Sequence, residues 1–204
     1  MRSILLVCLL AAACAADPDA AEETAGVDAG GAPDASATAP EATPETAGHQ
    51  PLLEAGLHPD ASDALRRLGI TADRISQTIG NAPASAGTHG VDGVANGHPF
   101  SAATDLRTGG MSEAAIRQEL DDLGRAGFAA WYRHTGHDGW SGVTHIHAVW
   151  VDTAIKRSLR AQAHDYCNWK NGLVSHAPYL FFHFSQPAVD LVRARFLAHN
   201  PAAD

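Results

Sequence analysis

Residues 17–50 limit what this chain can fold into, because they contain almost nothing that a folded core could use. The segment consists almost entirely of Ala, Asp, Glu, Pro, Thr and Gly, with no aromatic side chain and almost no large aliphatic one. Without apolar surface to bury, the entropy lost on ordering such a segment cannot be offset. We therefore interpret 17–50 as an extended, acidic, Pro-containing tether that precedes a folded domain.

The first 16 residues, MRSILLVCLLAAACAA, have the layout of a secretory signal: a positive charge, an apolar run and small residues before a cysteine. The apolar run is shorter than the roughly 20 residues that a transmembrane helix needs. The segment Leu10 to Cys14 resembles a bacterial lipobox. This predicts an exported lipoprotein, in the periplasm or at the cell surface, that contacts the membrane only through its N-terminal lipid. The alternative is ordinary cleavage after Ala13, which leaves a free N-terminal cysteine.

Residues 51–204 are long enough for one domain with its own core. All four Trp, all three Tyr and all six Phe lie there. Much of the formal net charge of −9 comes from the tether, and no basic patch indicates nucleic acid, so we expect a domain that binds none. We also expect a monomer. Cys167 is the only cysteine of this region, so it forms no internal disulfide, and we expect a buried, small apolar residue.

Apolar periodicity in this region predicts an α+β fold, in which a small antiparallel sheet is flanked by helices. Ser112 is a suitable N-cap for a helix with Ile116, Leu120 and Leu123 on one face. Aromatic and β-branched residues further along predict two strands joined by a loop of about ten residues. We expect helices over 58–69, 71–80, 112–124, 153–170 and 187–199, and strands over 128–132 and 143–151.

Twelve histidines in 204 residues exceed ordinary usage, and two clusters of them have informative surroundings. The first, GHPFSAATDL, contains His98 and Asp105, and the second, THIHAVW, contains His145 and His147. Residues i and i+2 of a strand point to the same face, so both imidazoles of the second cluster can address one site. Two imidazoles and a carboxylate suit zinc and leave a fourth position for water. The alternative is that these histidines face solvent or bond to backbone groups.

The two clusters together resemble the group that contains the D-Ala-D-Ala metallopeptidases, the lysostaphin-type endopeptidases and the Hedgehog signalling domain. The resemblance covers roughly residues 85–150: His-x6-Asp in an SAATDL context is followed about 40 residues later by His-x-His. In that group the first His, the Asp and the last His are zinc ligands, which implies one zinc ion bound by His98, Asp105 and His147. The remaining histidine assists catalysis, which implies that role for His145. The implied fold is that of the Hedgehog and D,D-peptidase domains.

The chain departs from the group's pattern just before the last expected ligand. Dipeptidases of the group place a Glu there, as Glu-x-x-His, to act as general base. Here position 144 is Thr, and Asp138 is the only carboxylate in the preceding stretch DGWSGVT. Either His145 is the base, since histidine has a suitable pKa without tuning, or the site binds zinc without catalysis.

Four further residues are secondary candidates. Arg133 ends a predicted strand and could pair bidentately with a substrate carboxylate, although it could equally be a solvated surface residue. His134 and His137 lie on the predicted loop between the strands and could rim a cleft, although loop histidines are more often simply exposed. His89 is the fourth of these secondary candidates.

These features favour a zinc metallopeptidase, of D,D-carboxypeptidase or endopeptidase type, that hydrolyses peptidoglycan peptides at a D-amino-acid bond. The substrate class follows from the resemblance and the expected export, and the reaction class follows from an open zinc site with three ligands. The alternative is a non-catalytic, zinc-stabilised module that binds wall peptides or a protein partner. The missing Glu favours the module, and the presence of His145 favours the enzyme.

Replacing Cys14 by Ser tests the lipobox. In a bacterial host that processes lipoproteins, we expect the Cys14→Ser protein to leave the membrane fraction, because the thiol that would carry the lipid is absent. Fractionation followed by immunoblotting measures this. Cys8→Ser is the control, since Cys8 lies inside the apolar run, and that protein should stay with the membranes. Membrane association of the Cys14→Ser protein would argue against the lipid anchor.

Overall fold

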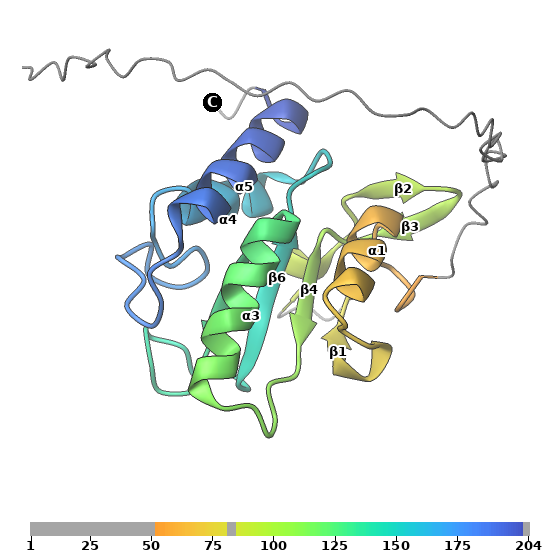
Figure 1. The fold of residues 1–204 in the computed structure, drawn as a ribbon. Helices are drawn as coiled ribbons and strands as arrows, with labels where there is room; N and C mark the ends of the chain where they lie inside the picture. The colour runs from red at the N-terminus through yellow and green to blue at the C-terminus, as the bar shows by residue number, and fades with distance from the viewer. Residues whose placement is uncertain (1–51, 81–84, 202–204) are drawn as a thin grey trace, which may run out of the picture. The chain divides into compact units, whose positions relative to one another are not determined.

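A four-stranded antiparallel sheet organises the part of the chain that the computed structural model describes, residues 52–80 and 85–201 (Figure 1). The strand order is β1-β4-β6-β5, and each neighbouring pair is antiparallel. The bounds are β1 (Ile75–Gln77), β4 (Ala103–Leu106), β5 (Phe128–Arg133) and β6 (His145–Trp150). The expected α+β class with a small antiparallel sheet is therefore confirmed.

Helices and a separate hairpin complete the described residues. The helices are α1 (Pro59–Arg67), the 3-10 helix η1 (Ala72–Arg74), α2 (Ala86–His89), α3 (Glu113–Ala126), α4 (Arg157–Tyr166) and α5 (Gln186–His199). Strands β2 (Gly93–Ala95) and β3 (His98–Phe100) pair only with each other, as an antiparallel hairpin. None of the described helices is long and apolar enough to cross a membrane. The expected signal, residues 1–16, and the expected tether, residues 17–50, lie outside the described residues.

One face of the sheet is covered by α3 and α1, which lie in front of the strands in Figure 1. Ile116, Leu120 and Leu123 of α3 belong to one buried cluster with Ile146 and Ala148 of β6. Ser112 caps this helix as expected, because its side chain accepts a hydrogen bond from the backbone N–H of Ala115. This face is therefore apolar and closed.

The opposite face of the sheet is apolar only at one end. There Ala129 and Val149 belong to a second buried cluster with Leu159 of α4 and with Val189 and Val192 of α5. Because side chains alternate along a strand, every second residue of β5 and β6 lies on this same face. Towards the other end of the two strands, these positions include polar residues. The buried polar residues of this face form the site described below.

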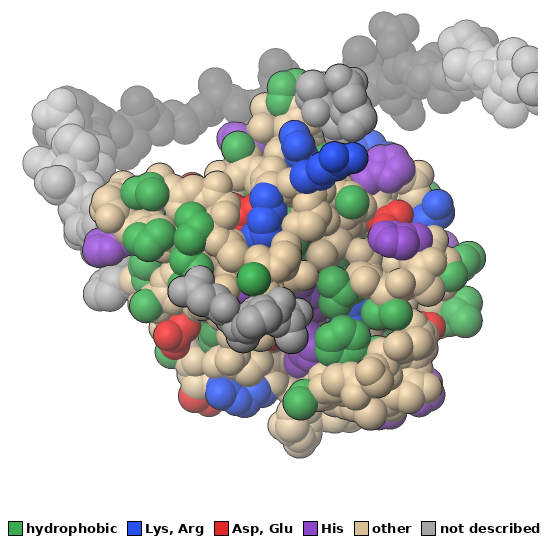
Figure 2. All heavy atoms as spheres, turned by 180° about the vertical axis from the view of Figure 1, so that it is seen from behind, with side chains coloured by type: hydrophobic (Ala, Val, Ile, Leu, Met, Phe, Trp, Pro, Cys, Tyr) green, Lys and Arg blue, Asp and Glu red, His purple; other side chains and the backbone are tan. Residues whose placement is uncertain are grey.

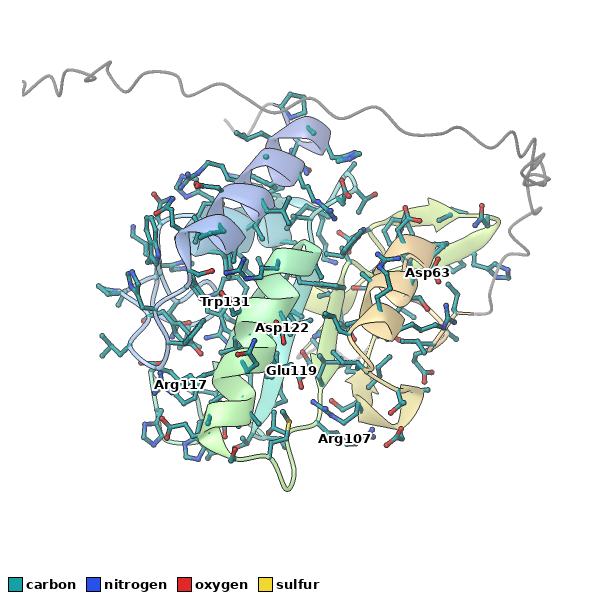
Figure 3. All side chains as sticks on the ribbon, in the orientation of Figure 1. Asp63, Arg107, Arg117, Glu119, Asp122 and Trp131 are labelled. Carbon is teal, nitrogen blue, oxygen red and sulfur yellow. The ribbon has the colours of Figure 1, made fainter. Side chains whose placement is uncertain are left out.

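An ion pair on one side of α3 and a cation–π contact on another hold the helix to its surroundings (Figure 3). Glu119 accepts two hydrogen bonds from Nη2 of Arg74, at 2.8 and 3.1 Å, which ties α3 to η1. Arg117 projects from another side of α3, pairs with Glu113 at 2.7 Å and lies over the ring of Phe181. These contacts fix the orientation of the helix that closes the apolar face.

Two predicted helices differ from the structure. The helix expected over 71–80 is wrong: after the single turn of η1 the chain extends as β1 and pairs with β4. The helix expected over 153–170 is shorter and begins at Arg157. Its start is delayed because the backbone N–H and the ammonium group of Lys156 both donate to Asp92, at 2.8 Å each. The helices expected over 58–69, 112–124 and 187–199 and the two strands are confirmed within a few residues.

Gly124 tests the close approach of α3 to α4 and α5. A Cβ at this position would lie 2.5 Å from Oη of Tyr166 and 2.8 Å from Cβ of Ala188. Alanine favours a helix over glycine by about 1 kcal/mol, but overpacking a closed contact costs about 1–3 kcal/mol. We therefore expect Gly124→Ala to lower the free energy of unfolding, measured in urea. Gly109→Ala is the control, because nothing lies within 4 Å of its added Cβ; a more stable Gly124→Ala protein would contradict the packing.

Candidate metal centre

The register of the sheet places Asp105 of β4 directly opposite His147 of β6. Nδ1 of His147 lies 2.8 Å from Oδ1 of Asp105. Only 8% of the surface of Asp105 and 1% of that of His147 remain exposed. A carboxylate and an imidazole therefore meet on the polar part of the sheet face, where both residues are almost completely buried.

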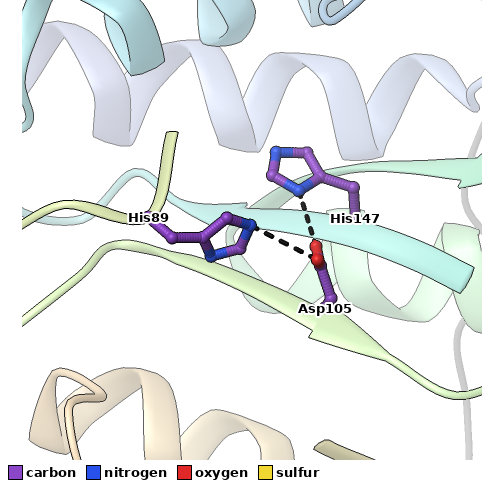
Figure 4. A group of neighbouring side chains, drawn as sticks. All are labelled: His89, Asp105 and His147. Carbon is purple, nitrogen blue, oxygen red and sulfur yellow. Dashed lines mark hydrogen bonds and ion pairs between the residues drawn. The ribbon is translucent and has the colours of Figure 1, made fainter. Parts of the chain in front are cut away.

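His89 approaches the same carboxylate from outside the sheet (Figure 4). It is the last residue of α2 and is 4% exposed. Its Nδ1–H donates to the backbone carbonyl of Thr78 at 3.0 Å, so Nε2 is left with a lone pair. That Nε2 lies 3.3 Å from Oδ2 of Asp105. One ligand atom from each of His89, Asp105 and His147 lies within 4.8 Å of the other two.

Gln162 of α4 orients the ring of His147. Its Oε1 lies 2.9 Å from Nε2 of His147 and accepts the proton of that nitrogen. Nδ1 of His147 then presents a lone pair to Asp105, as a metal ligand would. Such hydrogen bonds to the second ring nitrogen are typical of metal-binding histidines, whose tautomer they fix.

The electrostatics of this group favour a bound cation. Two ring lone pairs face the two oxygens of one carboxylate, and this arrangement needs either an additional ring proton or a cation. Burial lowers the pKa of His147 more than the nearby Asp105 raises it, which disfavours the additional proton. Burial raises the pKa of Asp105, but the adjacent imidazoles of His147 and His89 outweigh this and hold it well below its usual range. A neutral imidazole and an ionised carboxylate are the protonation states that bind metals.

His145 lies beside this group, two residues before His147 on β6. Its Nδ1–H donates to the backbone carbonyl of Val143 at 2.7 Å, and its Nε2 lies 3.5 Å from Oδ1 of Asp105. The ring of Trp140 contacts it edge-on, with the centroids 5.3 Å apart. His145 therefore points an unprotonated nitrogen towards the candidate metal position.

A cleft of about 790 Å³ opens over the group. Figure 2 shows histidine side chains in a depression on this face, beside a patch of hydrophobic side chains. Trp140, Val143 and Leu173 are the large apolar residues of the lining. The remaining lining residues are Ser76, Gln77, Ser85, Thr88, His89, Asp105, Arg107, Thr108, Gly109, Thr144, His145 and His147. The group is therefore reached from the surface through this cleft.

The structure does not bring His98, the third expected ligand, into this group. His98 is exposed, begins β3 and pairs with Ala95 of the hairpin, outside the sheet that carries Asp105. Asn96 and Gly97 form the tight turn with positive φ angles of 51° and 79°. An Asn-Gly pair favours such a two-residue hairpin turn, which carries His98 away from the site. The structure therefore groups His89, and not His98, with Asp105 and His147 as candidate ligands.

The other candidates lie in different surroundings. Arg133 is 1% exposed, opposite His145 in the register of β5 and β6, and therefore not a solvated surface residue. His134 and His137 are exposed, with ring centroids 4.5 Å apart, and line a separate cavity of about 570 Å³. They do not rim the cleft. Cys167 is buried and unpaired, as expected.

Sequence reasoning ranked His89 second because its partners are not its neighbours along the chain. The only local signals are that it precedes Gly90 and follows a segment rich in Gly, Ala, Ser and Asn. Its role depends on the carbonyl of Thr78 and on Asp105, which are 11 and 16 positions away. No regular helix or strand spacing links these positions.

Comparisons with known proteins add no relative. No family model, no curated protein and no solved structure matches the chain. The site is therefore defined by its geometry.

Alanine substitutions test the candidate ligand set. The full chain, purified without chelator, should carry about one equivalent of zinc. We expect His89→Ala, Asp105→Ala and His147→Ala each to lose it, because only three protein groups converge. His98→Ala is the matched control and should keep its metal. Metal retained in His89→Ala and lost in His98→Ala, measured by inductively coupled plasma mass spectrometry, would restore the set expected from the sequence.

The metal-free protein should lose stability in acid. Burial lowers the pKa of folded His147 below the ordinary value of 6.5, so the unfolded chain binds a proton that the folded chain rejects. The resulting stability is present above about pH 6.5 and is lost as the pH falls, by at most about 1.4 kcal/mol per pH unit. Urea unfolding of the chelated protein between about pH 7 and pH 5 measures this slope. His147→Gln should show a smaller slope, and equal slopes would exclude His147 as the cause.

Proposed function

We propose that this chain is a zinc-dependent peptidase with a domain related in fold to the Hedgehog and D,D-peptidase domains. The observation that carries the proposal is the convergence of His89 Nε2, Asp105 and His147 Nδ1 at a cleft, with His145 Nε2 alongside. Three protein ligands and an open side are typical of catalytic zinc sites, whereas structural sites are closed by four ligands.

The residues divide the chemistry between them. Zinc, when bound by the three ligands, would lower the pKa of a water molecule and polarise a carbonyl group. His145 would accept the proton of the attacking water at Nε2 and later return it to the leaving amine. The carbonyl of Val143 holds Nδ1–H of His145, so the proton must enter and leave at Nε2. Gln162 maintains the ligating tautomer of His147.

Peptidoglycan peptides, cleaved at a D-amino-acid bond, are the substrates that we propose. The support is the sequence resemblance, of which the structure brings Asp105, His145 and His147 together but not His98, and the export expected from residues 1–16. The cleft has the volume of a small-ligand site and combines an apolar wall, Trp140 and Val143, with polar residues such as Gln77 and Thr108. Such a mixed lining suits a short peptide with small side chains and many amide groups.

A second candidate function is a zinc-stabilised module that binds wall peptides without cleaving them. One observation favours it: Asp105, itself a candidate ligand, is the only carboxylate among the described residues that line the cleft. No Glu takes the position of the general base found in related dipeptidases. Catalysis therefore depends on whether His145 serves as the base.

His145→Ala distinguishes these functions. We expect the variant to keep its zinc and to lose about 10²- to 10⁴-fold in peptidase rate, the usual loss when a positioned acid–base group is removed. A digest of purified peptidoglycan, with products identified by mass spectrometry, measures the rate. His137→Ala is the control, because that histidine is exposed and lies outside the cleft lining.

Three results would change the assignment. A wild-type protein that contains zinc but cleaves no peptidoglycan fragment would support the binding module. Loss of zinc from His145→Ala would make His145 a fourth ligand and leave no room for a water. Full activity of His145→Ala would remove it from the mechanism.

A further inference from the structure

Arg133 is a buried cation in contact with no carboxylate among the described residues. It ends β5, is 1% exposed and lies with its guanidinium 5.5 Å from the ring of Trp131. Asp138 and Asp105 act on it only through longer-range attraction, and Asp105 is already engaged by histidines. Burial lowers the pKa of Arg133 to about 10, so the side chain remains charged at neutral pH. A buried charge without a partner is costly and calls for a compensating anion.

The unused donors of Arg133 have a specific arrangement. Nη1 donates to Oδ1 of Asn171, whereas Nε and Nη2 have no hydrogen-bond partner among the described residues. Nε and Nη2 form the edge of a guanidinium whose two N–H bonds are parallel, which is the edge that binds a carboxylate bidentately. Nδ2 of Asn171, also buried, is unpartnered as well. Three neighbouring nitrogen atoms thus offer donors and no acceptor.

The position of this pair connects it to the cleft. Arg133 is opposite His145 across β5 and β6, and Asn171 accepts a hydrogen bond from the backbone N–H of Leu173 at 3.4 Å. Both His145 and Leu173 line the cleft. The free donors therefore belong to buried residues that directly neighbour the lining of the cleft.

We propose that Arg133 and Asn171 form a subsite for a carboxylate group of the ligand that occupies the cleft. The identity of that ligand as a peptide rests on the proposed function, but the subsite itself does not. In a peptide, the carboxylate is either the terminal one or that of an acidic side chain close to the reacting bond. Both residues are almost fully enclosed, so a ligand reaches them only if the chain around them moves; the adjacent turn at residues 173–175 is half-buried at Leu173 and exposed at Val174 and Ser175.

Binding of small carboxylates to the full chain tests this subsite. The probes are N-acetyl-D-alanine, its uncharged amide, and N-acetyl-D-glutamic acid α-amide, which carries only a side-chain carboxylate; NMR titration measures each affinity. We expect one of the two acids to bind about 10- to 100-fold more tightly than the amide, as for hydrogen bonds to a charged group. Which acid is preferred identifies the source of the carboxylate. Equal binding of acids and amide would overturn the proposal.

Two variants separate the subsite from a purely structural role. Arg133→Gln should lose the preference for the acid, whereas Arg117→Gln, which removes an equal charge from the surface of α3, should keep it. Asn171→Asp supplies an internal carboxylate to Arg133, so it should raise the melting temperature and abolish binding of the acid. Retained preference in either Arg133→Gln or Asn171→Asp would overturn the proposal.

These titrations are independent of peptidase activity. A chain that cleaves nothing but binds the acid through Arg133 would refute the proposed enzyme and still support the subsite. A chain that cleaves peptides but binds acid and amide equally would support the proposed enzyme and refute the subsite.

Discussion

The carboxylate of Asp105 is the group on which the rest of this site depends. It lies on a nearly dry face of the sheet and faces ring nitrogens of His147 at 2.8 Å and of His89 at 3.3 Å. A buried, ionised carboxylate is costly unless positive charge or hydrogen-bond donors surround it. Asp105 therefore requires neighbours that donate hydrogen bonds or bind a cation. Each imidazole donates its ring proton away from Asp105, to Thr78 from His89 and to Gln162 from His147, so the other ring nitrogen directs a lone pair towards the carboxylate. A cation placed between them would interact favourably with both lone pairs and with the carboxylate.

The fold positions these candidate ligands from separate directions. The pairing of β4 with β6 sets Asp105 opposite His147, and α4 supplies Gln162 behind that histidine. A buried carboxylate, Asp92, accepts hydrogen bonds from Lys156 just before α4 and from the backbone N–H of Ala102 just before β4. This contact joins the segment that follows His89 to both elements of the site. The apolar face packed on α3 supports the sheet without entering the chemistry.

Sequence reasoning identified the candidate residues on the strands, Asp105 and His147. It ranked His89 second, because the place of that residue depends on tertiary contacts. The period of two along a strand correctly put His145 and His147 on one face, and the structure brings Asp105 to them. The family resemblance also placed His98 there, but the structure does not bring it to this group, because the Asn96-Gly97 turn folds that residue back into a hairpin. The same limit applied to α4, whose start depends on a side chain more than 60 positions earlier in the chain. Local patterns predict an element's type, whereas long-range hydrogen bonds decide its ends and neighbours.

The central claim is that one metal ion binds between His89, Asp105 and His147. Anomalous X-ray diffraction at the zinc absorption edge, on crystals of the full chain grown with zinc, tests it most directly. The account predicts a single strong peak in contact with Nε2 of His89, an oxygen of Asp105 and Nδ1 of His147, with one side open to the cleft. A peak bound by His98, or no peak at Asp105, would contradict it.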